Sequence, residues 1–213
     1  MKLYSYWRSS AAYRVRIALY YKNIAFEYLP VHLLNQGVEQ YSQAYSNVNP
    51  CQLVPTLLDG DLAVHQSLAI IDYLEDLYPN PALYPTKPSD KAQVKALSLD
   101  IISDLHPLNN LRVQNYLKKQ AGFSEQQKLD WSHYWMIKGF DAIEKQLKVI
   151  AGEYCFADQL TVADICLVPQ VYNAERFSLD MSVYPLIMAI TERCRKLPEF
   201  MQASPEKQID AVN

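Results

Sequence analysis

The chain has little glycine and no excess of basic residues, and both shortages exclude functions. Five glycines in 213 residues form no Gly-x-Gly-x-x-Gly, Gly-x-x-x-x-Gly-Lys-Ser/Thr or Gly-x-Ser-x-Gly motif. Nucleotide chemistry and serine-hydrolase chemistry are therefore not expected. Twenty Lys and Arg against 23 Asp and Glu give a formal charge of −3, which argues against a nucleic-acid partner.

Cysteine and histidine are too scattered to form a disulfide framework or a metal site. Cys51, Cys155, Cys166 and Cys194 contain no Cys-x-x-Cys pair, and no two histidines are spaced His-x-x-x-His. We expect no metal cofactor. The cysteines are predicted to be small buried apolar side chains.

Long apolar runs are also missing. The apolar stretches are shorter than the ~18 residues that a membrane-spanning helix needs. The first eight residues contain no apolar segment typical of a signal peptide. We therefore expect a cytoplasmic protein with no membrane partner.

A proline-rich segment divides the chain. Residues 79–90 hold four of the twelve prolines, and proline interrupts helices and central strands. We predict a first domain over residues 1–80, a linker over residues 81–90 and a second domain over residues 91–213.

The residues before the linker have the pattern of a small α/β domain in the order β-α-β-α-β-β-α. The turn Asp59-Gly60-Asp61 predicts a hairpin, and a helical crossover makes the first two strands parallel, so the sheet should be mixed. The expected elements are strand Leu3–Trp7, helix Ser10–Tyr21, strand Phe26–Val31, a helix near Gly37–Tyr45, strands Val54–Leu58 and Leu62–Val64, and helix Ser67–Leu77.

Beyond the linker the periodicity predicts helices only. Ser89 is a candidate N-cap of the first helix, which Pro107 should kink or end. Residues 125–150 form a long helix with a broad apolar surface, part of which could be an interface. Thr161 and Asp164 have the spacing of a capping box.

The first chemical signal lies where the first strand meets the first helix. Residues 7–14 place two serines, Ser9 and Ser10, and two arginines, Arg8 and Arg14, at a helix start. Unpaired amides and the helix dipole stabilise an anion, such as a thiolate or carboxylate, at this position. The alternative is that a serine only caps the helix and the arginines are solvated.

Two further motifs of the first domain have both a structural and a functional interpretation. A cis peptide bond at Val54-Pro55 would present the N–H and C=O of Val54 to another strand or to a bound peptide. Ser67 is either an N-cap or, with Gln66, a binding site for a carboxylate and its neighbouring amine.

Two polar clusters lie in the helical half. The segment from His106 to Arg112 is bent by Pro107, and a solvated bend is the favoured interpretation. Glu175 and Arg176 precede Phe177 and could form an ordinary surface ion pair.

Together and in this order, the motifs resemble the zeta class of glutathione transferases, the family of maleylacetoacetate isomerase. The resemblance covers nearly the whole chain and is most specific at residues 4–10 and 168–177. It implies a thioredoxin-like N-terminal domain, an all-helical C-terminal domain, glutathione as cofactor and a homodimer.

The resemblance also implies a glutathione site. The γ-glutamyl end would lie by Gln66 and Ser67, the cysteinyl backbone would pair with Val54, and the helix start would border the thiol. The implied binding residues are Ser9, Ser10, Ala11, Ala12, Tyr13, Arg14, Gln40, Val54, Pro55, Gln66 and Ser67, with His106, Asn110 and Arg112 at the rim.

The implied reaction is the cis–trans isomerisation of maleylacetoacetate to fumarylacetoacetate in tyrosine and phenylalanine catabolism, with transferase activity as a possible accompaniment. Ser9, with Ser10 beside it, would stabilise the glutathione thiolate. Arg8 and Arg176 would bind the dianionic keto acid and the enolate that forms from it.

Other functions stay open. Ala11 stands where many zeta members carry a cysteine, and the bend at His106 resembles the maleylpyruvate branch. Maleylpyruvate isomerase is therefore an alternative, as are a conjugating glutathione transferase and a haloacid dehalogenase. A further alternative is a non-catalytic interaction protein of this fold. The combination of Arg8, Ser9 and Arg176 argues against it.

Overall fold

The computed structural model describes residues 1–34 and 38–212 and divides into two compact units. The first comprises Met1–Ala82 and Arg195–Asn213, and the second comprises Leu83–Cys194. The C-terminal segment groups with the N-terminal half because its helix α10 (Pro198–Ala203) packs against α1 (Ser10–Tyr21). The boundaries at residues 80 and 91 stay a prediction.

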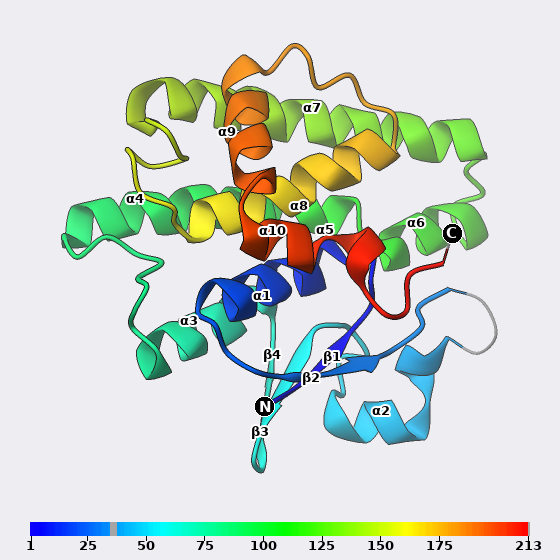
Figure 1. Cartoon of the computed structure of the whole chain (residues 1–213). Helices are drawn as coiled ribbons and strands as arrows, with labels where there is room; N and C mark the ends of the chain where they lie inside the picture. Colours follow the sequence, from blue (N-terminus) through cyan, green and yellow to red (C-terminus); the bar gives the residue numbers. More distant parts are fainter. Residues whose placement is uncertain (35–37, 213) are drawn as a thin grey trace. The chain divides into compact units, whose positions relative to one another are not determined.

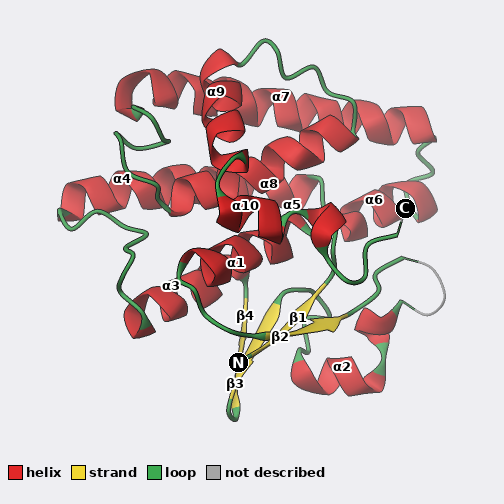
Figure 2. Ribbon diagram, in the orientation of Figure 1, coloured by secondary structure: helices red, strands yellow, loops and turns green. Residues whose placement is uncertain are grey.

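A four-stranded mixed sheet forms the centre of the first unit (Figures 1 and 2). Its strand order is β2-β1-β3-β4, with β1 and β2 parallel and the other pairs antiparallel. The mixed sheet and the chain order β-α-β-α-β-β-α predicted from the sequence are confirmed. The elements are β1 (Lys2–Ser5), α1, β2 (Glu27–Pro30), the 3-10 helix η1 (Glu39–Tyr41), α2 (Gln43–Val48), β3 (Thr56–Asp59), β4 (Leu62–His65) and α3 (Ser67–Leu77).

Several element boundaries of this unit differ from the prediction, and two of the differences have clear local reasons. Ser42 caps α2 by accepting a hydrogen bond from the Tyr45 N–H at 3.2 Å, so the helix begins after it. The expected start at Gly37 lies outside the described residues. Strand β3 begins at Thr56 because Pro55 has no N–H to donate to the sheet.

The second unit consists of helices. They are α4 (Pro88–Leu99), the π-helical turn η2 (Asp100–Leu105), α5 (His106–Leu108), α6 (Leu111–Lys119), α7 (Glu125–Ile150), α8 (Val162–Arg176) and α9 (Pro185–Arg195), while η3 (Pro205–Lys207) belongs to the first unit. Across the described residues, none of the helices has the length and apolar character needed to cross a bilayer.

The start of the first long helix was wrong in the prediction. Lys87 occupies the cap position, Pro88 is the first helical residue, and the Ser89 hydroxyl donates to the carboxylate of Asp90 at 2.9 Å. Proline is well suited to this position because a first-turn N–H has no helical partner. Further along, Pro107 follows the π-helical turn, in agreement with the expected interruption.

The buried helix α8 is held at its start by the predicted capping box. The Thr161 hydroxyl accepts from the Ala163 N–H at 3.3 Å. The fully buried Asp164 carboxylate accepts from the N–H groups of Thr161 and Cys155 at 2.8 and 2.7 Å. Asp164 therefore joins the loop before α8 to the helix.

We predict that Asp164→Ala strongly destabilises the protein, since it leaves two buried amides without an acceptor. The expected loss in the free energy of unfolding is ~2–6 kcal/mol, at ~1–3 kcal/mol for each of the two unsatisfied buried groups. Urea unfolding followed by circular dichroism measures it. Gln127→Ala is the control, because it removes the equivalent side chain from the exposed capping box of α7; an equal loss in both variants would contradict the prediction.

Candidate active site

The strand register brings three of the predicted motifs to one edge of the sheet. Tyr4 pairs with Thr56 across β1 and β3, and Thr56 pairs with His65 across β3 and β4. Pro55 and Gln66 immediately adjoin this row, and β1 ends one residue after Tyr4. The junction before α1, the Val54-Pro55 segment and the start of α3 therefore share this edge.

At the junction, Ser9 caps α1. Its Oγ accepts from the Ala12 N–H at 3.2 Å, and its carbonyl accepts the first helical hydrogen bond, from the Tyr13 N–H at 2.8 Å. The amides of Ser10 and Ala11 consequently have no partner within the helix. The structural interpretation of Ser9 is confirmed, and it coexists with an anion-binding role, because capping uses an oxygen lone pair and not the hydroxyl hydrogen.

The following helical residues lie at different depths. Ala11 is half-buried, whereas Ala12 and Tyr13 are buried. The Tyr13 hydroxyl donates to the Phe200 carbonyl at 3.4 Å, so this side chain reaches α10. Arg14 is fully buried, and its NH1 donates to the Ser67 Oγ at 3.3 Å, which connects α1 to the start of α3.

The predicted capping role of Ser67 is wrong. Gln66 occupies the cap position with φ +71°, and Ser67 is the first helical residue. The buried Ser67 hydroxyl accepts from Arg14 instead, while Gln66 is exposed. This geometry is compatible with the functional interpretation of Gln66 and Ser67, because a helix start beside an exposed side-chain amide can bind an anion.

The Val54-Pro55 peptide bond is cis, and the loop before it is firmly held. The Asn49 amide donates to the Leu53 carbonyl at 2.7 Å, and the Tyr45 hydroxyl donates to the same carbonyl at 2.6 Å. Burial raises the pKa of Tyr45, so this hydroxyl keeps its proton at neutral pH.

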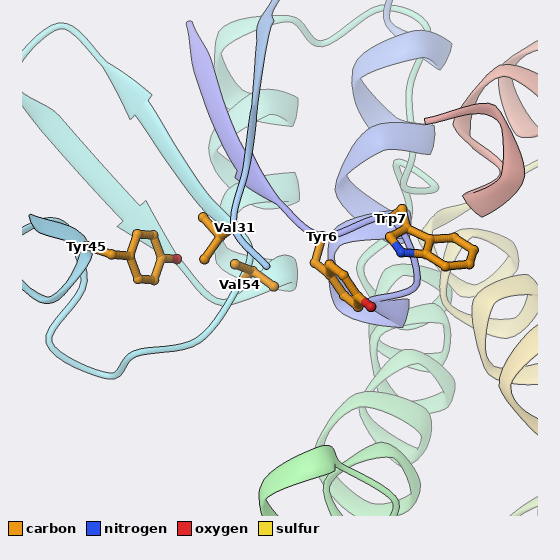
Figure 3. Close-up of a cluster of buried hydrophobic side chains, with 5 residues drawn as sticks. All are labelled: Tyr6, Trp7, Val31, Tyr45 and Val54. Atoms are coloured by element: carbon orange, nitrogen blue, oxygen red, sulfur yellow. The ribbon is translucent and has the colours of Figure 1, made fainter. Parts of the chain in front are cut away.

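Val54 also connects the loop to the junction. It packs in a buried cluster with Tyr6, Trp7, Val31 and Tyr45 (Figure 3). Tyr6 and Trp7 lie directly before Arg8 and Ser9 in the chain. The apolar core under the sheet edge thus contacts both the loop and the junction.

Arg8 and Gln40 complete the first unit's candidate residues. The half-buried Arg8 guanidinium lies 4.6 Å from the centre of the Trp7 ring, a cation–π contact. Gln40, in η1, is 5% exposed, and its Oε1 has no hydrogen-bond partner within the part of the chain that the structure describes. A buried acceptor of this kind suits a ligand N–H.

The remaining candidates form a separate group in the second unit. His106 begins α5, and Asn110 caps α6 by accepting from the Arg112 N–H at 3.0 Å. The Arg112 side chain is exposed. Arg176 ends α8, where its NH1 donates to the Asn173 Oδ1 at 3.2 Å and its guanidinium lies 5.6 Å from the Phe177 ring centre.

Sequence reasoning missed two residues that hold the junction. Asp210 accepts from the Trp7 N–H at 3.0 Å, across 203 positions of sequence, and buried Arg16 donates to the Trp7 carbonyl at 2.9 Å. No local pattern points to either contact, although a charged residue within a buried helical stretch was a visible signal for Arg16.

The cysteine prediction holds for three of the four residues. Cys155, Cys166 and Cys194 are buried, but Cys51 is exposed because it lies in the loop before Val54, with its Sγ 3.9 Å from the His65 Nε2. Among residues 1–34 and 38–212, no group of three or more His, Cys, Asp or Glu side chains could hold a metal ion.

Comparisons with known proteins identify the family. Residues 3–82 match the family described as glutathione S-transferase, N-terminal domain. A solved maleylpyruvate isomerase, described as a bacterial glutathione S-transferase of the zeta class, is 43% identical, with a TM-score of 0.96 over 100% of both chains. This chain belongs to the zeta-class glutathione transferases. The fold predicted from the sequence is thereby confirmed.

Two other relatives span the chain. A probable maleylacetoacetate isomerase from Vibrio cholerae is 52% identical over 209 residues, which are 98% of this chain and 97% of the relative. A maleylacetoacetate isomerase from Methylobacterium extorquens AM1, solved with bound malonate and GSH, is 34% identical, with a TM-score of 0.95 over 100% of both chains.

We predict that Asn49→Ala loosens the loop that presents Val54. The variant leaves the Cys51 N–H without its Asn49 acceptor and removes donors to the Leu53 carbonyl and Thr56 hydroxyl, so unfolding should require ~1–3 kcal/mol less free energy. Limited proteolysis of residues 49–53 gives the local readout. Asn47→Ala, at an exposed position of α2, is the control, and unchanged cleavage in Asn49→Ala would refute the prediction.

Proposed function

We propose that this zeta-class protein is a glutathione-dependent cis–trans isomerase that converts maleylacetoacetate to fumarylacetoacetate in tyrosine and phenylalanine catabolism. The observation that carries the proposal is the shared sheet edge, where the capped start of α1, Val54 before a cis proline and exposed Gln66 come together. Relatives with this name match the chain over nearly its full length.

The residues at the edge fit glutathione. Gln66 and the start of α3 suit its γ-glutamyl carboxylate and amine, Val54 suits its cysteinyl backbone, and Gln40 contributes the buried acceptor. When bound, glutathione would supply a thiolate that adds reversibly to the conjugated cis alkene, permits rotation about the former double bond and leaves unchanged.

Ser9 is proposed as the thiolate's hydrogen-bond donor. A free thiol with a pKa of ~8.5 is mostly protonated at pH 7, and lowering that pKa by about two units corresponds to ~2.7 kcal/mol. The Ser9 hydroxyl hydrogen and the amides of Ser10 and Ala11, which have no partner within the helix, all favour the anion. Buried Ala12, Tyr13 and Arg14 shape this helix start.

Two arginines are proposed to hold the substrate. A guanidinium binds a carboxylate at two points, and the cation–π contact of Arg8 with Trp7 and the hydrogen bond from Arg176 to Asn173 orient both groups. Each would also stabilise the negative charge that builds up on the keto oxygen. This stabilisation of developing charge is the interaction that accelerates the reaction. His106, Asn110 and Arg112 are proposed as rim residues.

Maleylpyruvate is the second candidate substrate, because a solved maleylpyruvate isomerase matches all of this chain. Ala11 places no thiol beside the two serines, so this position supplies no auxiliary sulfur for either acid. We also propose a cytoplasmic homodimer. Its support is the family resemblance and the apolar surface of α7, where Trp131, Tyr134 and Trp135 line a shallow hollow with Phe123.

The deciding experiment measures isomerisation of maleylacetoacetate and maleylpyruvate side by side, with and without glutathione. Faster glutathione-dependent turnover of maleylacetoacetate is the expected result. Preference for maleylpyruvate would assign the protein to the other branch. Glutathione binding without turnover of either acid would refute the isomerase proposal and favour conjugation, dehalogenation or a non-catalytic role.

We predict that Ser9→Ala lowers kcat by ~10²-fold, the usual effect of losing one donor to a developing or bound anion, with much less effect on glutathione affinity. The variant also loses its helix cap, worth ~1 kcal/mol of stability. Ser9→Thr keeps both the hydroxyl and the cap and serves as control. Wild-type kcat in folded Ser9→Ala would remove Ser9 from catalysis.

We predict that Arg176→Ala raises the KM for the keto acid by ~10 to 100-fold, because it removes charged hydrogen bonds worth ~1.5–3 kcal/mol. Steady-state kinetics at saturating glutathione give the measurement. Arg193→Ala removes another exposed arginine of the second unit and should leave the KM unchanged. Unaltered kinetics in Arg176→Ala would place the carboxylate elsewhere.

A further inference from the structure

The backbone just before Ser9 is held by side chains and not only by secondary structure. The Trp7 N–H donates to the Asp210 Oδ2 at 3.0 Å, and the Trp7 carbonyl accepts from the Arg16 NH2 at 2.9 Å. The Tyr6 carbonyl accepts from the Arg16 NH1 at 3.4 Å and from the Ser9 N–H at 3.0 Å. The Tyr6 carbonyl and both backbone polar groups of Trp7 are therefore bound.

Arg16 anchors the turn to two elements. Besides its bonds to Tyr6 and Trp7, its NH1 donates to the Ser5 Oγ at 3.2 Å, and its Nε donates to the Ala203 carbonyl of α10 at 3.0 Å. The side chain is fully buried, and burial lowers its pKa. A charged group at such a position needs these partners and a nearby anion.

Asp210 supplies that anion and is itself fixed. It is 8% exposed, and its Oδ1 accepts from the Tyr28 hydroxyl at 2.7 Å. The turn that carries it is held by Gln208, whose Nε2 donates to the carbonyls of Gln202 and Ser204 at 2.8 Å. The C-terminal segment thus delivers one carboxylate to one backbone amide of the junction.

We propose that Asp210 and Arg16 are positioning residues for the active site, which set the place of the Ser9 hydroxyl and of Arg8 by clamping Trp7 between them. The Arg8 guanidinium lies 4.6 Å from the centre of the Trp7 ring, and Ser9 follows Trp7 by two residues in the chain. A displacement of Trp7 therefore moves both groups. This inference rests on the proposed function for its effect on catalysis.

The test compares wild type with Asp210→Ala, Asp210→Asn and, as matched control, Asp76→Ala, which removes an exposed carboxylate of the same unit. In Asp210→Ala, amide hydrogen exchange of residues 6–9 should accelerate about tenfold, the effect of one hydrogen bond. The hairpin β3–β4 should exchange as in wild type. Asp210→Asn keeps an oxygen acceptor and should restore most of the protection.

Two functional readouts separate positioning from stability. The ultraviolet absorbance of bound glutathione's thiolate should appear at higher pH in Asp210→Ala, and kcat should fall more than glutathione KM rises. Unaccelerated exchange, or accelerated exchange with an unchanged thiolate titration, would overturn the inference. If Asp210→Ala does not fold, Arg16→Lys gives the same readouts, because one ammonium cannot span Ser5, Trp7 and Ala203.

The result of the Asp210 test does not depend on which keto acid the protein isomerises. Hydrogen exchange and the thiolate titration need no turnover, so they decide the inference even if wild type isomerises neither acid. In that case the proposed function fails by itself. If glutathione does not bind at all, the exchange of residues 6–9 alone decides whether Asp210 clamps the junction.

Discussion

The pairing register of β1, β3 and β4 is the constraint on which the candidate site depends. Tyr4, Thr56 and His65 lie in one row, so the segments that follow or precede them share an edge. A slip of one residue would turn every side chain of a strand to the other face of the sheet. The buried Leu3 and Leu57 make such a slip costly. Core packing therefore fixes the positions of the polar groups above it.

Ser9 illustrates how one oxygen can satisfy folding and chemistry together. Its oxygen lone pair caps the start of α1 by accepting from the Ala12 N–H, and the cap does not use the hydroxyl hydrogen. The same helix start leaves two further amides without a partner inside the helix. An anion at this point therefore interacts with groups that the fold has already oriented, and little reorganisation is needed on binding.

Local features were predictable from the sequence, and distant ones were not. The hairpin at Gly60, the Thr161 capping box and the serine at the start of α1 depend on residues within a few positions, so short patterns revealed them. The contacts of Asp210 with Trp7 and Tyr28 join the two ends of the sequence and leave no periodic trace. The prediction that Ser67 is an N-cap was wrong, because the Ser67 hydroxyl instead accepts a hydrogen bond from Arg14, which is distant in sequence.

The division into units has a consequence for the order in which contacts can form during synthesis. Leu83–Cys194 is inserted between two parts of the first unit, and a chain emerges from the ribosome in sequence order, with N-terminal regions folding first. The sheet and α1 can therefore form early, but Trp7 gains its Asp210 acceptor only after the whole second unit has been made. A nascent chain would carry an incomplete junction until Asp210 has left the ribosome.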